Sequence, residues 1–144
     1  MARLRRGIGG ALVLDAEGLV KLASGDPRVR HRCEAARRRR GRVVTAASTL
    51  PEVLRGGPKD ASLHRVLGRL TVIGIEKEEG RTAGELLGRA GVPGHRCALG
   101  ALVAVVALAQ PRPVVLLTSD VDDLARLTEE PGRPREERVK VARI

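Results

Sequence analysis

Carboxylates stand at the ends of the apolar stretches of this chain. Asp15 follows the run ALVL, and Asp120 follows VVLLTS, with Asp123 three residues further on. Glu52 comes shortly after a third apolar run, RVVTAA. Carboxylates clustered without histidine or thiol partners form a hard oxygen site, which suits Mg²⁺ or Mn²⁺. Such an ion can activate water and neutralise the charge of a phosphodiester, so these acids indicate metal-assisted hydrolysis.

A simpler interpretation exists for each acid taken alone. Aspartate at a junction between a strand and a helix is often an N-cap, and Asp120 can be explained in that way. Capping or solvation is the more frequent role of a single acid in such a position. The joint placement of three acids after three apolar runs favours a site.

The elements that must position these acids are short strands alternating with helices. Apolar runs predict strands at 11–14, 42–47, 71–76, 113–120 and, at an edge, 137–144. Helical spacing predicts helices at 16–23, 26–40, 48–57, 59–70, 76–91, 97–110 and 120–130. This alternation is typical of a three-layer α/β/α domain with a mostly parallel central sheet. Because sites gather at the carboxyl ends of parallel strands, we expect the acids to converge there.

Local signals set the ends of several helices. Asp26 is expected to cap the helix that opens with Pro27, and Gly41 to stop it. Ser48 or Thr49 is expected to open the next helix. The length of 144 residues fits one domain spanning 1–144, with a basic extension at 1–9 and a polar loop at 129–137 before the last strand.

Composition narrows the classes of partner. The chain has 27 Lys and Arg against 17 Asp and Glu, a formal net charge of +10, which favours an anionic partner such as nucleic acid or an acidic protein segment. It has no Phe, Trp or Tyr, which disfavours modules that bind single strands by stacking bases on aromatic rings. Two cysteines without a CxxC pair and no apolar leader favour a cytoplasmic location. The longest apolar run, 101–109, is too short to span a membrane.

Four motifs then occur in a characteristic order: LVLDAEGLVKL, AASTLPEVLRG, CALGALVAVVALA and VVLLTSDVDDLARL. From about residue 10 onward the chain resembles the PIN-domain family, and within it the VapC ribonuclease toxins of bacterial VapBC toxin–antitoxin pairs. The resemblance implies a PIN-like fold and an endoribonuclease that hydrolyses RNA phosphodiesters with Mg²⁺ or Mn²⁺. It also implies a small cognate antitoxin as partner, and a homodimer.

The resemblance assigns roles to individual positions. Asp15, Glu52 and Asp120 match the acids that bind the metal and carry the catalysis, and Asp123 matches an auxiliary metal ligand. Small hydroxyl residues often lie near the metal in this family, and their matches here are Thr118 and Ser119, which we expect to contact the substrate.

Gly100 is a departure from the family pattern. Glycine inside a buried helix costs roughly 1 kcal/mol relative to alanine. Family members usually carry an aspartate at this position of the inner helix, pointing into the acid cluster. Its absence predicts weakened ion binding and water activation. The alternative is a non-catalytic PIN-like protein that binds RNA or an antitoxin.

Two further features carry weaker hypotheses. Arg40, which ends a run of four arginines, is a candidate to contact RNA phosphates, although a solvated helix end also explains the run. Arg55, just behind Glu52, is a candidate to contact either RNA or an acidic segment of a partner. The tripeptide HRC occurs at 31–33 and again at 95–97, which suggests a zinc site. Because residues two apart do not share a helix face, core packing of the two cysteines is the better explanation.

Overall fold

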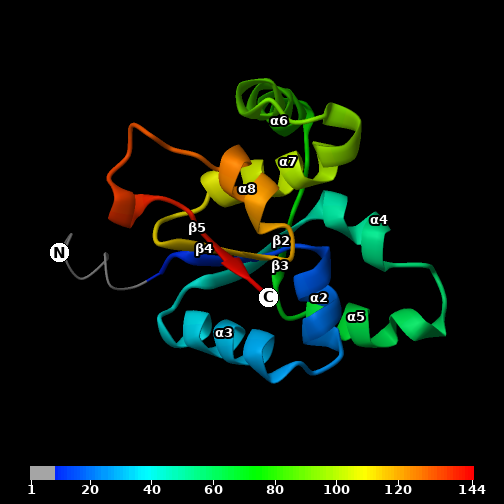
Figure 1. Cartoon of the computed structure of the whole chain (residues 1–144). Helices are drawn as coiled ribbons and strands as arrows, with labels where there is room; N and C mark the ends of the chain where they lie inside the picture. The colour runs from blue at the N-terminus through cyan, green and yellow to red at the C-terminus, as the bar shows by residue number, and fades with distance from the viewer. Residues whose placement is uncertain (1–8) are drawn as a thin grey trace.

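The computed structural model describes residues 9–144 and contains one five-stranded sheet with every neighbouring pair of strands parallel. The spatial order is β3-β2-β1-β4-β5. The strands are β1 (Ala11–Leu14), β2 (Arg42–Ala46), β3 (Thr71–Ile73), β4 (Val114–Thr118) and β5 (Lys140–Arg143) (Figure 1). The predicted α/β class is confirmed, with a sheet that is parallel throughout, and the last strand lies at an edge as expected.

The register of the central strands determines which residues lie side by side at the carboxyl edge of the sheet. Leu14 of β1 lies beside Leu117 of β4. The next residues, Asp15 and Thr118, therefore emerge side by side at the carboxyl edge. The two segments are about a hundred residues apart in sequence, so the pairing of β1 with β4 is what brings them together.

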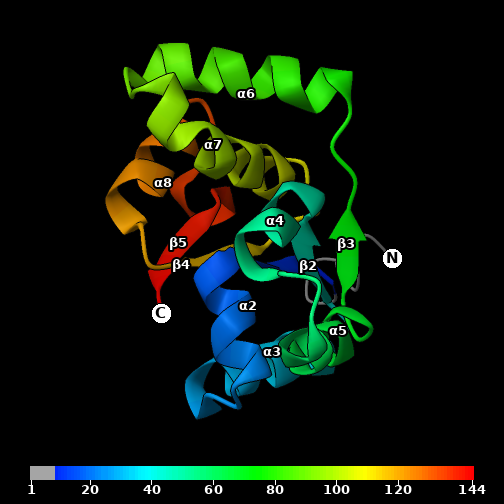
Figure 2. The ribbon, with the colours of Figure 1, turned by 90° about the vertical axis from the view of Figure 1, so that its right-hand side faces the viewer.

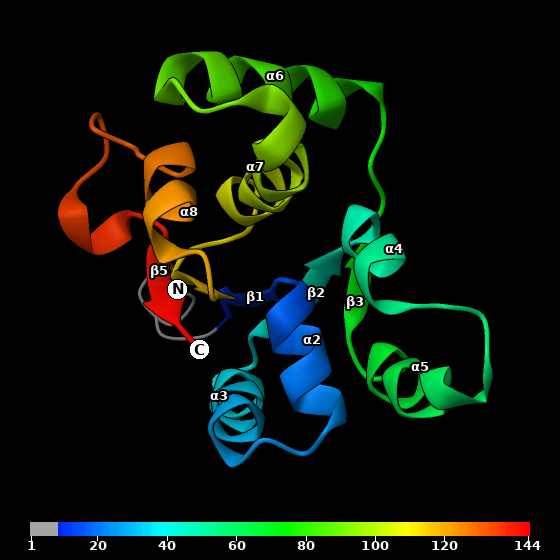
Figure 3. The same cartoon turned by 45° about the vertical axis from the view of Figure 1, so that its right-hand side comes forward.

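Helices cover both faces of the sheet. The helices are α2 (Ala16–Ala23), α3 (Pro27–Arg38), α4 (Leu50–Val53), α5 (Ala61–Leu67), α6 (Lys77–Ala90), α7 (Gly94–Leu108) and α8 (Val121–Leu127). Figure 3 shows α6, α7 and α8 on one side and α2, α3 and α5 on the other. In Figure 2, α6 lies outside α7 and forms the outermost layer. The three-layer arrangement follows from a parallel sheet whose two apolar faces must both be buried.

The core divides into one cluster on each face, because neighbouring residues of a strand point to opposite sides. Leu116 packs with the buried residues of α7 and α8, whereas Leu117 packs with those of α2 and α3. In α7 the side chains of Ala101, Ala104 and Ala107 are fully buried. Small residues at this spacing let the α7 backbone approach the sheet closely, which explains why this face of the inner helix carries alanines.

The segment 48–57 differs from the single helix that its sequence predicts. It contains a 3₁₀ turn, η1 (Ala47–Thr49), then the four-residue α4, and then a loop. Neither Ser48 nor Thr49 caps a helix, and both hydroxyls are buried without a hydrogen-bond partner in the described residues. The chain is already helical at Thr49, with φ −78° and ψ −25°, whereas a capping residue needs an extended backbone.

Helix α3 begins as predicted and ends slightly differently. The Asp26 carboxylate accepts hydrogen bonds from the backbone N–H of Arg28 and Val29, so Asp26 is the N-cap. The residue with left-handed backbone at the other end is Arg40, with φ 57°, not Gly41. A side chain at Gly41 would instead collide with backbone oxygens, since a Cβ there lies 2.9 Å from the carbonyl oxygen of Gly9.

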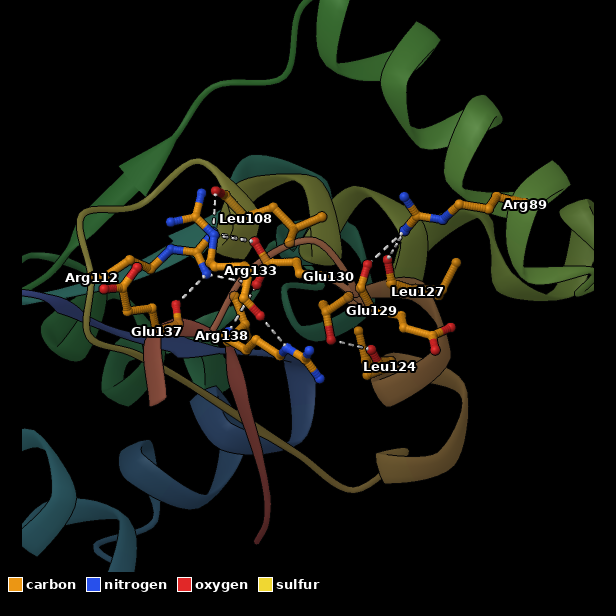
Figure 4. A network of polar contacts seen from close by, with 12 residues as sticks. Arg89, Leu108, Arg112, Leu124, Leu127, Glu129, Glu130, Arg133, Glu137 and Arg138 are labelled. Atoms are coloured by element: carbon orange, nitrogen blue, oxygen red, sulfur yellow. Dashed lines mark hydrogen bonds and ion pairs between the residues drawn. The ribbon is translucent and has the colours of Figure 1, made fainter. Parts of the chain in front are cut away.

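A polar network fastens the loop before β5. The Arg112 guanidinium donates to both carboxylate oxygens of Glu130 at 2.7 Å, and Glu130 also accepts from the backbone N–H of Val139. Arg112 donates in addition to the carbonyl oxygens of Leu108 and Glu137 (Figure 4). The predicted polar loop therefore has a fixed course, with a 3₁₀ turn, η3 (Arg135–Glu137), near its end.

No single helix among residues 9–144 has the length and apolar character needed to cross a membrane. Helices α6 and α7 meet the length and composition criteria only as a pair, and they are bent by 117° relative to each other.

Candidate active site at the carboxyl edge of the sheet

Four elements meet at the carboxyl edge and enclose a pocket of about 350 Å³, which we call the acid pocket. Helices α2, α4, α7 and α8 surround this edge in Figure 3. The acids that line the pocket are Asp15, Glu17, Glu52, Asp120 and Asp123. Gly100, Thr118 and Ser119 line it as well. The residues that the sequence marks as metal-binding therefore share one cavity.

Asp15 is held in place from two sides. Its Oδ1 accepts a hydrogen bond from the backbone N–H of Gly18 at 3.0 Å, so it caps α2. Its Oδ2 accepts from the Thr118 hydroxyl at 2.5 Å. The same hydroxyl accepts from the backbone N–H of Asp120 at 3.0 Å. Thr118 is fully buried, so its hydroxyl links the ends of β1 and β4 in a fixed geometry.

Asp120 makes no side-chain cap for α8, although it stands at the first position before that helix. Burial raises the pKa of Asp120, and the neighbouring carboxylate of Asp123 adds to the rise. The backbone N–H of Asp123 and the charge of Arg96 act in the opposite direction and lower the pKa of Asp120, but burial and the neighbouring carboxylates outweigh them. A raised carboxylate pKa of this origin is common at functional sites.

Glu52 reaches the pocket from α4. Burial raises its pKa, and the carboxylate of Asp15 contributes to the rise. An electrostatic effect of Asp15 on Glu52 requires the two carboxylates to lie near each other, since interactions between charges weaken with distance and screening. The short turn η1 and helix α4 thus bring Glu52 towards Asp15.

Two residues that the sequence analysis missed line the pocket from α7. Arg96 and Cys97 stand four and three positions before Gly100, so the three share one face of the helix. The Cys97 thiol donates to Asp123 Oδ2 at 3.6 Å, and the Arg96 charge acts to lower the pKa of Asp120. Helical spacing from Gly100 is the signal that would have found both residues.

The two arginines proposed to contact substrate lie elsewhere. The Arg55 guanidinium donates to the carbonyl oxygens of Pro51, Glu52 and Leu54, at the end of α4. Arg40 follows α3 and precedes β2, which places it at the amino edge of the sheet. Neither lines the acid pocket.

The acids as placed do not form a complete ligand set for a divalent cation. Within the part of the chain that the structure describes, no three His, Cys, Asp or Glu side chains are grouped so that they could hold a metal ion. Both oxygens of Asp15 already accept hydrogen bonds, and position 100 offers no side chain. A Cβ built on Gly100 would meet only Leu124 Cδ2 at 3.5 Å and Leu127 Cδ1 at 3.9 Å, which are ordinary contacts.

The two HRC tripeptides do not form a zinc site. Cys33 is buried in the cluster beneath the sheet, and Cys97 is buried in the cluster above it. The sheet separates the two thiols, so core packing explains them, as the sequence analysis favoured.

Comparison with known proteins defines the class of fold. No family model and no curated protein matches the sequence. A solved chain from VapBC2 of Rickettsia felis, crystallised with a DNA fragment from its promoter, matches with a TM-score of 0.66 at 16% identity, over 93% of this chain and 98% of that one. A chain from a toxin–antitoxin complex of Klebsiella pneumoniae matches with a TM-score of 0.60 at 20% identity, over 79% of this chain and 90% of that one.

At these identities the likeness establishes the fold: the chain has the PIN-domain α/β fold of VapC toxins. The resemblance that its four motifs indicate is thus confirmed for the fold.

Proposed function

We propose that this chain is an endoribonuclease of the PIN type whose hydrolysis of RNA phosphodiesters is impaired by Gly100. The observation that supports this is the shared pocket of Asp15, Glu52 and Asp120, with a glycine facing it from α7. The resemblance implies Mg²⁺ or Mn²⁺ as cofactor, and a complete set of ligands requires an acid at position 100. The pKa values of Glu52 and Asp120 are raised, mainly by burial and in part by neighbouring carboxylates, which supports a site where a cation would offset the negative charge.

The residues of the chain have distinct tasks in this proposal. Thr118 fixes the orientation of Asp15 through its hydroxyl. Ser119 and Asp123 complete the wall of the pocket beside Asp120. Arg96 supplies positive charge at the rim, where a phosphate must approach a cluster of carboxylates.

A second candidate is a non-catalytic protein that binds RNA or an antitoxin through the same fold. The lack of a metal-holding group of three side chains among residues 9–144 favours it. Of the two solved chains described above, one comes from VapBC2 and the other from a toxin–antitoxin complex. We therefore propose a small antitoxin as partner under either candidate, and, from the family resemblance, a homodimer.

Restoring the missing acid separates the two candidates. Gly100→Asp is expected to cleave a structured RNA in the presence of Mn²⁺ at least about tenfold faster than the chain as it stands, a barrier change of roughly 1.4 kcal/mol. A Cβ at this position makes only ordinary contacts with Leu124 and Leu127, so its addition requires no shift of the neighbours. The matched control is Gly100→Asn, which has nearly the same size and no charge, and it should stay as slow as the original chain.

The measurement is the initial rate of cleavage of a labelled RNA, resolved on a denaturing gel. Equal rates for the Asp and Asn variants, with RNA binding retained in both, would refute the impaired nuclease and leave the non-catalytic binder.

A further inference from the structure

A groove runs along α3 on the face of the sheet opposite α7. It consists of two adjoining hollows of about 670 Å³ and 460 Å³, which share the lining residues Pro27, Arg28 and Arg32. One end reaches Pro113 at the amino edge of the sheet, and the other reaches Ile144 near the carboxyl edge. In Figure 1, α3 lies beneath β4 and β5 on this side. We call this feature the α3 groove.

The α3 groove is strongly basic. Its walls carry Lys21, Arg28, His31, Arg32, Arg39 and Arg143. Asp26 is the one acid among the lining residues in the described chain, and its carboxylate is already engaged in capping α3. None of the ion pairs found among residues 9–144 involves the lysine or arginine side chains of this set. Their charge is therefore available to a ligand.

The spacing of the cations suits a regularly charged polymer. Arg28 and Arg32 are four residues apart on α3, about 6 Å along its axis, and Arg39, the C-cap of α3, follows seven residues after Arg32. A nucleic-acid strand offers a phosphate at each nucleotide, so it can meet such a row at several points. The apolar lining between the cations, including Leu12 and Val115, can contact sugars without the aromatic stacking that this chain lacks.

The carboxyl end of the groove lies near the acid pocket. Arg143, which lines the groove there, donates a hydrogen bond to the carbonyl oxygen of Ser119 at 3.2 Å. Ser119 itself lines the acid pocket. A lining residue of the groove is therefore in direct contact with a lining residue of the pocket, although the two hollows share no residue.

We propose that the α3 groove binds single-stranded RNA through its phosphates and guides the strand to the acid pocket. The guiding role rests on the proposed function, whereas binding in the groove requires no cleavage. An acidic peptide is the competing occupant, but it offers no fixed charge at every residue and no reason for the groove to end near the pocket.

The test is RNA binding by the full chain in EDTA, measured by fluorescence anisotropy with a labelled 16-nucleotide oligouridylate over a range of salt concentrations. The variant is Arg28→Gln, Arg32→Gln, Arg39→Gln together. The matched control replaces three exposed arginines outside the groove, Arg30, Arg38 and Arg65, by glutamine, so both carry the same charge change. Thermal unfolding by circular dichroism checks that both variants fold.

The groove variant is expected to bind at least about tenfold more weakly, and its log–log salt slope should shrink by about two, since each phosphate contact on a single strand contributes about 0.7. The control should retain the original slope. Equal loss in both variants would overturn the proposal. The proposal would also be overturned if an oligoglutamate of 16 residues bound the chain as tightly as the RNA and bound the groove variant more weakly. That result would favour an acidic peptide as the occupant of the groove.

These outcomes are independent of the cleavage experiment. RNA binding that depends on the groove, combined with no cleavage by Gly100→Asp, would refute the nuclease and keep the groove. Cleavage by Gly100→Asp, combined with RNA binding that does not depend on the groove arginines, would support the nuclease and refute the groove proposal.

Discussion

At the scale of single residues, the acid pocket shows a conflict between stability and function. Thr118 donates a hydrogen bond to the carboxylate of Asp15, whereas the carboxylate of Asp120 lies near the like charge of Asp123. Burial and like charges raise the pKa of Asp120 and of Glu52. Native structures retain such charges where they serve a purpose beyond folding.

Replacing Asp120 by asparagine should therefore stabilise the chain at neutral pH. The folded state raises the pKa of Asp120 above the ordinary value of 3.8, so the carboxylate opposes folding at any pH above the folded pKa. We expect a higher urea midpoint for Asp120→Asn at pH 7. The gain should fade as the pH drops through the folded pKa and vanish below 3.8, where the aspartate is protonated in both states.

The control for this experiment is Glu85→Gln, which removes an exposed charge on α6 outside the pocket. It should leave the urea midpoint nearly unchanged at both pH values. A loss of stability in Asp120→Asn at pH 7 would contradict the expectation that the raised pKa of Asp120 opposes folding.

At the scale of elements, the position of β5 depends on charged side chains as well as on the sheet. Glu130 and Arg112 form a bidentate pair whose side chains are only 14% and 16% exposed. Together with the bond from Val139, the pair fixes the loop that delivers the chain to β5 (Figure 4). Hydrogen bonding from Arg112 lowers the pKa of Glu130, so the ionised form is the one that stabilises this loop.

Glu130→Gln is expected to lower the free energy of unfolding by about 3 kcal/mol at pH 7, because it leaves Arg112 partly buried without its partner. The lowered pKa sets the pH dependence: the contribution is present above the ordinary value of 4.5 and is lost as the pH falls through the folded pKa. The difference between the two proteins should therefore shrink in acid. Urea unfolding at pH 7 and at lower pH measures it.

Glu136→Gln is the matched control, since Glu136 is exposed in the same loop and takes part in none of the ion pairs found among residues 9–144. It should unfold like the original chain. Equal stability of both variants at pH 7 would show that the Arg112 pair contributes nothing to the loop.

At the scale of the whole molecule, one sheet carries two separate core clusters, and the adjacent residues Leu116 and Leu117 belong to different ones. The acid pocket lies at the carboxyl edge of this sheet, and the α3 groove, which runs along the face that packs against α3, ends near it. A sheet shared by both clusters links their stabilities. We therefore expect residues 1–144 to unfold as the single domain that the length predicts.

Truncation of either leucine tests this expectation. Leu116→Ala and Leu117→Ala should each lower the free energy of unfolding by about 3 kcal/mol, because both side chains are almost fully buried. In each variant the far-ultraviolet circular dichroism and the methyl resonances from both clusters should follow one transition. Two separate transitions, one for each cluster, would refute a single cooperative domain.

The sequence alone determined the alternation of strands and helices, the acids at the strand ends and the glycine at position 100. These features are local, because periodicity and residue type within a short window report which backbone form buries apolar side chains. The same local patterns identified Asp26 as the cap of α3. They failed at 48–57, where a 3₁₀ turn packed against α7 replaced the start of a longer helix.

Only the tertiary structure decided which side chains meet. The register of β1 against β4 placed Asp15 beside Thr118, and the packing of α7 brought Arg96 and Cys97 to the same pocket. It also turned Arg55 towards backbone carbonyls and joined distant arginines into the α3 groove. The physical reason is that such contacts depend on strand register and helix packing between segments far apart in the chain, which no short window of sequence contains.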